Sequence, residues 1–507
     1  MEEAEEIITR SGSVRGKRMT SEEGFSHFEY LGIPYAQPPI GELRFQNPIP
    51  VKPWIETLDA TKAGPVCYQK GNFGFGLGEM SEDCLTLNIY TQDKNLDSKP
   101  VMIWIHGGGF TEGAGSQYIP VKLIREGVIV VTLNYRLGSL GFLTFGNNLV
   151  SGNMGLKDQQ LAICWVKQNI ERFGGDPGQI TLFGESAGGI SVHAHVLSPW
   201  NYGLIKGAIA QSGTMLIYSN SRQNEERFAR TAADRLGCEN DDLGEETLRC
   251  LQAVDIDQLN NDLDPRNANF NKIKGPAPFE WRPVIDKYSS NPFLPLESLE
   301  AMKTGTFNRI PFMSGTVKNE GALMFGILRG AGWSRANLTE FWKYVGPSLI
   351  LQSPSVGDYT PQERDMATIS LKYYNHPVEE TIVGLDQPWM DLMGDAAFLS
   401  PDQKSVGLMS QYSPAVFNYY FTQQVATSLL AQLFKLGQEY TPVHADDIAF
   451  LFDFIVQNMT ISSSDGDKKL SSKMVKYWTN FAKYGHPTPS SDDDLTTWIP
   501  ATTTDKV

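Results

Sequence analysis

The sequence contains no long apolar run and no excess of positive charge. No stretch of roughly 18 consecutive apolar residues occurs, so no segment is predicted to span a bilayer. Lys and Arg total 43 against 58 Asp and Glu, a formal net charge of -15. This acidity argues against nucleic acid or an anionic membrane as a partner, and solubility is its simplest role. Repeats, low-complexity segments and linkers are also absent, although 507 residues alone suggest about two to four domains.

Cysteine is scarce, with five residues in the chain. Cys67 and Cys84 bracket a Gly- and Phe-rich loop, and Cys238 and Cys250 bracket a short acidic one. Such close pairs are predicted to form disulfides that close surface loops. Cys164 lies within an apolar helical pattern and is predicted to be a buried free thiol.

Disulfides bear on the compartment, because they persist in oxidising environments. The acidic N-terminus, residues 1–6, does not have the pattern of a signal peptide. Asn337 and Asn458 each begin an N-glycosylation sequon, which also favours the secretory pathway. The expectation is a secreted or secretory-pathway protein whose signal peptide lies outside this sequence, with a cytoplasmic protein as the alternative.

A G-x-S-x-G pattern is the central motif of the chain. The β-prone run Ile180–Phe183 leads into Gly184-Glu185-Ser186-Ala187-Gly188, and a helix-compatible segment follows. A strand, a sharp turn and a helix are the context in which this pattern presents a serine nucleophile. The Ser186 hydroxyl should therefore stand at the carboxyl end of a sheet, above the positive end of a helix.

Further apolar runs predict the architecture. Continuous runs end at Phe110 and Asn134, and shorter strands are expected at residues 207–213 and 415–421. Residues 153–173 read as an amphipathic helix, and residues 220–271 as polar helices outside the sheet. Strands that alternate with helices predict an α/β fold with a large, mostly parallel sheet flanked by helices.

Two segments carry a family resemblance. Residues 30–45 and residues 79–90 resemble the signature segments of the type-B carboxylesterase/cholinesterase family of α/β-hydrolases, closest in character to general, including insect-type, carboxylesterases. The likeness runs in order over nearly the whole chain. It implies one domain over residues 1–507, with a helical cap-like insertion at about 326–410. It also implies salt bridges between Arg44 and Glu82 and between Arg136 and Asp176.

The resemblance also implies a set of catalytic residues. The run that ends in Gly107-Gly108-Gly109 resembles the family's oxyanion loop. Such a loop supplies N–H donors to the negative oxygen of the tetrahedral state. The expected set is the triad Ser186, Glu320 and His444, the oxyanion donors Gly108, Gly109 and Ala187, and the supporting Ser212.

The acid and the base depend on chain order, because the triad of this fold runs serine, acid, histidine. Seven histidines are available. Only His444 follows both Ser186 and Glu320 in a segment that resembles the family's histidine loop. His444 is expected to take the Ser186 proton and return it to the leaving alcohol. Glu320 would orient the imidazole and stabilise its cation.

The acyl pocket is expected to be roomy. Many relatives have a tryptophan wall shortly after the second serine, where this chain has Tyr218 or Ser219. The pocket is assigned to Phe110, Tyr218, Ser219, Phe279 and Trp281.

The predicted function is a serine hydrolase of carboxylic esters that works through an acyl-enzyme, with broad specificity and without metal or cofactor. Its partner is a small ester, and the oligomeric state stays open. A specialised hormone, pheromone or lipid esterase and a non-catalytic adhesion relative are the alternatives. The loop from Cys67 to Cys84 lacks the tryptophan typical of cholinesterases, and Glu185 stands where juvenile-hormone esterases usually have Gln.

Overall fold

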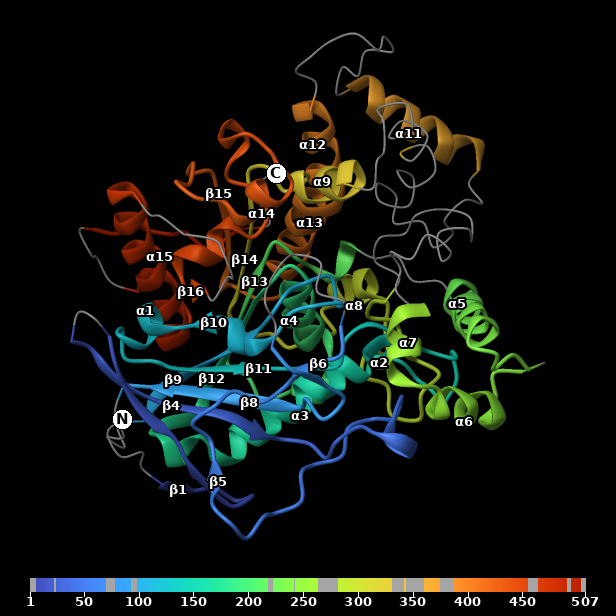
Figure 1. Cartoon of the computed structure of the whole chain (residues 1–507). Coiled ribbons are helices and arrows are strands. Elements are labelled where there is room, and N and C mark those ends of the chain that lie inside the picture. The colour runs from blue at the N-terminus through green and yellow to red at the C-terminus, as the bar shows by residue number, and fades with distance from the viewer. Residues whose placement is uncertain are drawn as a thin grey trace.

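The structure is a computed structural model of the whole chain (Figure 1). The residues it describes are 6–21, 24–69, 78–92, 98–217, 222–240, 242–262, 281–330, 342, 360–373, 386–454, 464–489 and 494–502.

A nine-stranded sheet forms the centre of the molecule, in the order β15-β14-β13-β12-β9-β11-β8-β4-β3. Every pairing from β15 to β11 is parallel, and β8, β4 and β3 continue the sheet in antiparallel pairs. The expected mostly parallel sheet is thus confirmed. Its strands are β3 (Lys17–Thr20), β4 (Ser26–Pro34), β8 (Thr86–Thr91), β9 (Lys99–Ile105), β11 (Ile129–Leu133), β12 (Gly175–Glu185), β13 (Gly207–Gln211), β14 (Phe312–Val317) and β15 (Val416–Phe421).

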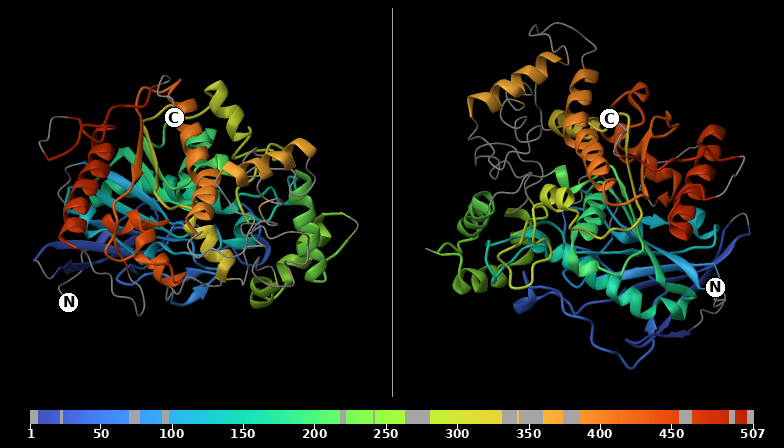
Figure 2. Two further views of the ribbon diagram at one scale, coloured as in Figure 1. Left: turned by 90° about the horizontal axis from the view of Figure 1, so that it is seen from above. Right: turned by 180° about the vertical axis from the view of Figure 1, so that it is seen from behind.

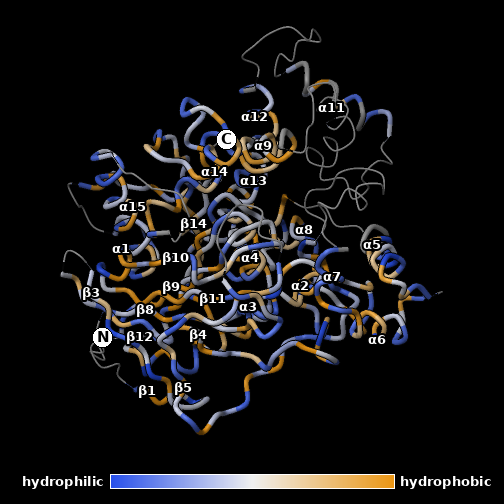
Figure 3. The backbone as a smooth tube through the Cα atoms, viewed as in Figure 1, coloured by the Kyte–Doolittle hydropathy of each residue, from blue (hydrophilic) through white to orange (hydrophobic). Residues whose placement is uncertain are grey.

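Both faces of the sheet are covered, which explains the uninterrupted apolar runs. Alternate side chains of β9 point to opposite faces. Ile103 and Ile105 belong to one buried cluster, and Met102 and Trp104 to another. Coloured by hydropathy, the central strands are accordingly mostly hydrophobic (Figure 3).

Two helices mark the two covered faces. α3 (Met154–Asn169) contributes Ile163 and Val166 to the first cluster, and α15 (Asp465–Tyr484) contributes Trp478 and Phe481 to the second. They lie on opposite sides of the sheet (Figures 1 and 2). The helix expected over residues 153–173 is therefore confirmed as α3 followed by a 3-10 turn, Ile170–Phe173.

The remaining helices frame these layers. Those before β14 are α1 (Val121–Ile124), α2 (Gly138–Phe142), α4 (Ala187–Leu197), α5 (Arg222–Arg235), α6 (Glu245–Ala253), α7 (Ile256–Asp262) and α8 (Ser298–Thr304). Those after it are α9 (Ala322–Gly330), α11 (Pro361–Tyr373), α12 (Asp386–Gly394), the π-helical turn η7 (Asp395–Leu399), α13 (Ser400–Met409) and α14 (Leu429–Leu433). Short strands pair outside the main sheet: β1 (Glu6–Ile8), β2 (Ser13–Arg15), β5 (Leu58–Asp59), β6 (Val66–Cys67), β7 (Met80–Ser81), β10 (Tyr118–Ile119) and β16 (Asp453–Phe454).

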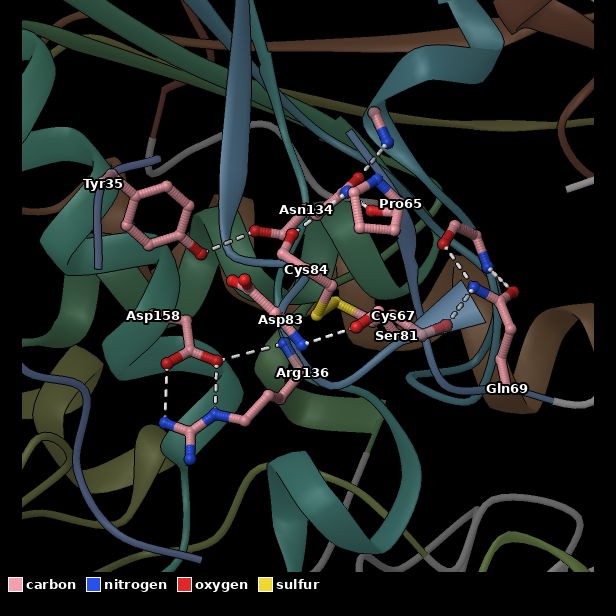
Figure 4. The surroundings of a disulfide bond; sticks show 12 residues. Tyr35, Pro65, Cys67, Gln69, Ser81, Asp83, Cys84, Asn134, Arg136 and Asp158 are labelled. Atoms are coloured by element: carbon pink, nitrogen blue, oxygen red, sulfur yellow. Dashed lines mark hydrogen bonds and ion pairs between the residues drawn. A yellow bond between two sulfur atoms is a disulfide. The ribbon is translucent and has the colours of Figure 1, made fainter. Parts of the chain in front are cut away.

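Both predicted disulfides are formed, Cys67–Cys84 and Cys238–Cys250. Figure 4 shows the first of them beside Asn134, whose side-chain amide donates to the carbonyl oxygens of Cys84 and Pro65. Cys164 is free as predicted, but its side chain is only partly buried.

One predicted salt bridge is confirmed and the other is wrong. Arg44 binds both carboxylate oxygens of Glu82, each at 2.7 Å. Arg136 pairs with Asp158 of α3 rather than with Asp176 (Figure 4). Asp158 is completely buried next to Arg136, whereas Asp176 is partly exposed and accepts hydrogen bonds from Gly178 and Gln179.

Removal of the Asp158 charge should destabilise the fold. The pair is 3% and 0% exposed, so Asp158→Asn would leave the Arg136 charge buried without its anion. A broken buried pair costs about 3–5 kcal/mol, and the free energy of unfolding in denaturant should fall by about that amount. Glu245→Gln, in an exposed pair with Arg249, is the control and should leave the midpoint unchanged. Equal effects of both changes would contradict this account.

Candidate active site

The turn at Ser186 joins β12 to α4, as the motif predicts. Ser186 has φ 57° and ψ −121°, a strained conformation for a residue with a side chain, and α4 begins at the next residue. The turn fits closely against β9, because a Cβ on Gly188 would lie 2.0 Å from the carbonyl oxygen of Ile105. Only glycine permits that approach. Ser186 is partly exposed, while all of α4 behind it is buried.

The glycine-rich loop after β9 lies against this turn. A Cβ on Gly107 would lie 3.2 Å from the Cβ of Ser186. Gly108 and Gly109 follow with φ values of 107° and 61°. Among the described residues, no loop or turn hydrogen bond uses the amide of either glycine as a donor. The Ala187 amide is in the first turn of α4, where backbone donors have no partner within the helix.

Glu320 and His444 meet from two different loops. The Nδ1 atom of His444 lies 2.5 Å from Oε2 of Glu320, and both side chains are buried. The other carboxylate oxygen of Glu320 accepts from the Val317 amide at the end of β14. Asn319 pairs with Val443 in a backbone bridge, which joins the two loops. The structure therefore brings together the acid and the histidine that the sequence predicts.

A second carboxylate faces the other side of the same ring. The Nε2 atom of His444 lies 3.1 Å from Oε1 of Glu185, the residue before Ser186. Among the described residues no hydrogen bond joins Nε2 to Ser186. The imidazole is thus flanked by two buried carboxylates. Sequence reasoning noted Glu185 only as a departure from one subfamily and missed this contact.

The two carboxylates determine the protonation of His444. Burial lowers the pKa of the imidazole, but Glu185 and Glu320 outweigh burial and raise it to about 9. Burial raises the pKa of Glu185 to about 8, and the His444 cation opposes that rise. Nε2 of His444 and Oε1 of Glu185 are 3.1 Å apart, and neither atom has a hydrogen-bond partner among the described residues, so the two groups interact through their charges. The direction that the geometry supports is the raised pKa of His444, since anions face both ring nitrogens.

Asp447 is a third buried carboxyl group near the ring. One of its oxygens accepts from Gln211 and from Tyr419, each at 2.9 Å, and Trp478 of α15 donates to Gln211. Asp447 contributes to the raised pKa of His444. Sequence reasoning missed this group, and its only sequence signal is an acidic residue three positions after His444.

The remaining predicted residues lie as follows. Ser212 has φ 49°, follows β13 and is buried, and its hydroxyl has no partner among the described residues. Phe110 is completely buried and packs against Phe142 at 4.8 Å between ring centroids. Trp281 is 3% exposed. Five predicted positions lie outside the described residues: Tyr218, Ser219, Phe279, Asn337 and Asn458.

In the described part of the chain, no group of three or more His, Cys, Asp or Glu side chains is arranged to hold a metal ion. Within the same residues, no helix has the length and apolar character needed to cross a membrane.

The mostly parallel sheet, with a strained serine between its central strand and a buried helix, defines the class of α/β-hydrolase proteins. Comparison with known proteins narrows the class. A model described as "Carboxylesterase family" matches residues 3–507. The chain belongs to the carboxylesterase family, the enzymes that hydrolyse carboxylic esters with a serine.

Its relatives carry different activities in their names. A carboxylic ester hydrolase of Bombus ignitus is 34% identical over 507 residues, covering 96% of this chain and 86% of that protein. A juvenile hormone esterase of Tribolium castaneum is 34% identical, with coverage of 95% and 84%. An acetylcholinesterase of Bungarus fasciatus is 33% identical, with coverage of 96% and 79%. Relatives of such varied names leave the substrate of this chain open.

Proposed function

We propose that the protein cleaves esters through an acyl-enzyme in which Ser186 is the nucleophile, His444 the general base and Glu320 the orienting acid. The Ser186 oxygen attacks the ester carbonyl carbon while its proton passes to Nε2 of His444. His444 then returns that proton to the leaving alcohol, and a water molecule repeats the sequence to release the acid. The observation that carries the proposal is the hydrogen bond between Glu320 and His444. The same His444 ring contacts Glu185, the residue directly before the strained Ser186.

The contact between His444 and Glu185 is compatible with this role. Catalytic hydrogen bonds are often long or misaligned in a free enzyme and tighten only when substrate is bound. Since Ser186 directly follows Glu185, the Nε2 atom is already on the side of the nucleophile. The oxyanion would be bound by the amides of Gly108 and Gly109, in the loop that lies against the Ser186 turn, and by the Ala187 amide at the start of α4.

The substrate range that we propose is broad, with a roomy acyl pocket bounded in part by Trp281. The loop from Cys67 to Cys84 contains no tryptophan, which favours a general carboxylesterase over a cholinesterase. Glu185, where hormone esterases usually have Gln, favours it over a hormone esterase. A pheromone or lipid esterase is the second candidate. The two disulfides favour an oxidising compartment, so we propose secretion for the mature enzyme.

A series of p-nitrophenyl esters tests this range. Each methylene that finds apolar cover contributes about 0.8 kcal/mol, so kcat/KM should rise several-fold from acetate to butyrate. Acetylthiocholine, measured in parallel, should not be preferred over the simple esters. A steady decline of kcat/KM with acyl length would show a closed pocket, and preferred turnover of acetylthiocholine would favour a cholinesterase.

The pH dependence tests the flanking carboxylates. His444 must be neutral to accept a proton, so kcat/KM should rise with pH. The apparent pKa of this rising limb should lie above about 6.5, the ordinary pKa of histidine. Glu185→Gln removes one anion that stabilises the imidazolium, and this limb should move to lower pH by about one unit or more. Glu245→Gln, in an exposed pair with Arg249 and not among the groups that shift the pKa of His444, is the control. A limb that stays in place in the Glu185 variant would exclude Glu185 from control of the base.

A further inference from the structure

Two side chains of α3 hold the segment that begins at Trp281. Asn153, the completely buried N-cap residue of α3, donates from its side-chain amide to the carbonyl oxygen of Val284 at 2.8 Å. Its side-chain oxygen accepts from the Val284 amide at 2.9 Å. The Asn153 side chain thus pairs with both backbone groups of one residue, as a neighbouring strand would. Val284 has little freedom to shift along the chain direction while this pair is intact.

One helical turn later, Lys157 holds the same segment by charge. Its ammonium lies 3.5 Å from the Asp286 carboxylate, and the two side chains are 1% and 0% exposed. The ammonium also donates to Ser151 at 2.8 Å and to the Gly152 carbonyl at 3.0 Å. Asp286 in turn accepts from the amides of Phe293 and Leu294, which closes the loop of residues 286–294.

Packing alone does not explain why Lys157 and Asp286 form a buried charge pair. Lysine is almost never fully buried unless it is paired, and apolar residues of similar volume often stabilise a fold as well or better. A paired, hydrogen-bonded charge does fix position, because each partner has few alternative contacts. The Lys157–Asp286 pair therefore points to a need for one fixed placement of the loop.

The segment also reaches both the nucleophile helix and the oxyanion loop. Phe293 packs edge-on against His195 of α4, with ring centroids 5.3 Å apart. At the other end, the Trp281 ring lies 4.0 Å from the Cβ position of Gly138, whose amide donates to the Phe110 carbonyl oxygen at 2.7 Å. Phe110 directly follows the oxyanion residue Gly109. A shift of residues 281–286 would therefore move Trp281 relative to the site of the acyl group.

We infer that Asn153 and Lys157 are specificity-determining positioning residues, which set the acyl preference of the enzyme by fixing the Trp281 wall from α3. The inference rests on the proposed function, because it assigns Trp281 to the wall of the acyl pocket. Neither residue touches the reacting atoms in this account. Their effect passes through Val284 and Asp286 to the tryptophan.

The test compares Asn153→Gly and Lys157→Met with wild type on p-nitrophenyl acetate, butyrate and hexanoate. Glycine keeps the positive φ of position 153, 60°, and removes only the side-chain pairing. In each variant the butyrate-to-acetate ratio of kcat/KM should change by about four-fold or more, the effect of one buried methylene. Lys167→Met, on the same helix but bonded to the Pro177 carbonyl, is the matched control and should keep the wild-type ratio.

A second comparison separates positioning from general stability. In a Trp281→Ala background the wall is absent, so the two α3 substitutions should no longer alter the ratio. Equal losses on all three esters with an unchanged ratio, or an undiminished shift in the Trp281→Ala background, would overturn the inference. Thermal unfolding checks that each variant is folded. Asn153→Asp keeps the acceptor of the Val284 amide and replaces any variant that does not fold. Asn153→Asp should shift the butyrate-to-acetate ratio in the same direction as the other α3 variants.

Failure of the proposed function and failure of the positioning role give different results. A wild type that hydrolyses none of the esters and is not phosphorylated at Ser186 by an organophosphate overturns the proposed function. An active wild type whose α3 variants keep its ratio overturns only the positioning role.

Discussion

Ser186→Ala should lower kcat/KM for p-nitrophenyl butyrate by at least about 10⁴-fold, because loss of the nucleophile of a serine hydrolase leaves only binding and oxyanion stabilisation. The fold should be unaffected, since one partly exposed oxygen is removed and no core volume is lost. The midpoint of thermal unfolding, measured beside the activity, should equal that of wild type. Ser26→Ala, in an exposed contact with Thr20 near the edge of the sheet, is the control and should keep full activity.

A covalent label identifies the same atom independently. An organophosphate should add one phosphoryl group to the wild type, on Ser186, and none to the Ala variant. Peptide mass spectrometry locates the adduct. An adduct on another residue, or turnover by the Ala variant near the wild-type rate, would mean that Ser186 is not the nucleophile.

Local features of the site were predictable because they depend on residues close in sequence. The pattern from Gly184 to Gly188, between an apolar run and a helix-compatible segment, predicts a tight turn, and the structure has that turn between β12 and α4. The two disulfides join cysteines separated by 17 and 12 positions, so their spacing alone indicated the pairing. The alternation of apolar runs and helices similarly indicated the parallel sheet.

Contacts between distant elements were less predictable. Asp158 and Asp176 are both compatible with a partner for Arg136, and only the rotation of α3 places Asp158 in the core. No motif predicts that Glu185 contacts His444 or that Asp447 lies near the same ring. Both depend on how segments distant in sequence come together in the fold. The only sequence signal for these contacts was the presence of charged residues such as Lys157 and Asp158 within an amphipathic helical pattern. Their partners could be assigned only from the fold.

The two carboxylates that flank His444 should have different roles, and Glu320→Gln measures the difference. Glu320 accepts a hydrogen bond from Nδ1–H of His444, which keeps the proton on Nδ1 and leaves Nε2 free to act as the base. An amide can donate at that position and favour the wrong tautomer, so kcat at pH 7 should fall by about 10⁴-fold, as for the corresponding change in a serine protease triad. Glu185→Gln is the matched control, because it makes the same substitution on the other side of the ring.

The comparison of kcat at several pH values decides between the two roles. The Glu185 variant should keep substantial turnover above its shifted acid limb, whereas the Glu320 variant should stay low at every pH, because a wrong tautomer is not corrected by loss of a proton elsewhere. Unfolding midpoints of both variants show whether either effect is structural. If Glu185→Gln is the more damaging change across the pH range while Glu320→Gln stays within about ten-fold of wild type, Glu185 is the orienting acid and Nδ1 is the base, since the ring nitrogens would have exchanged roles.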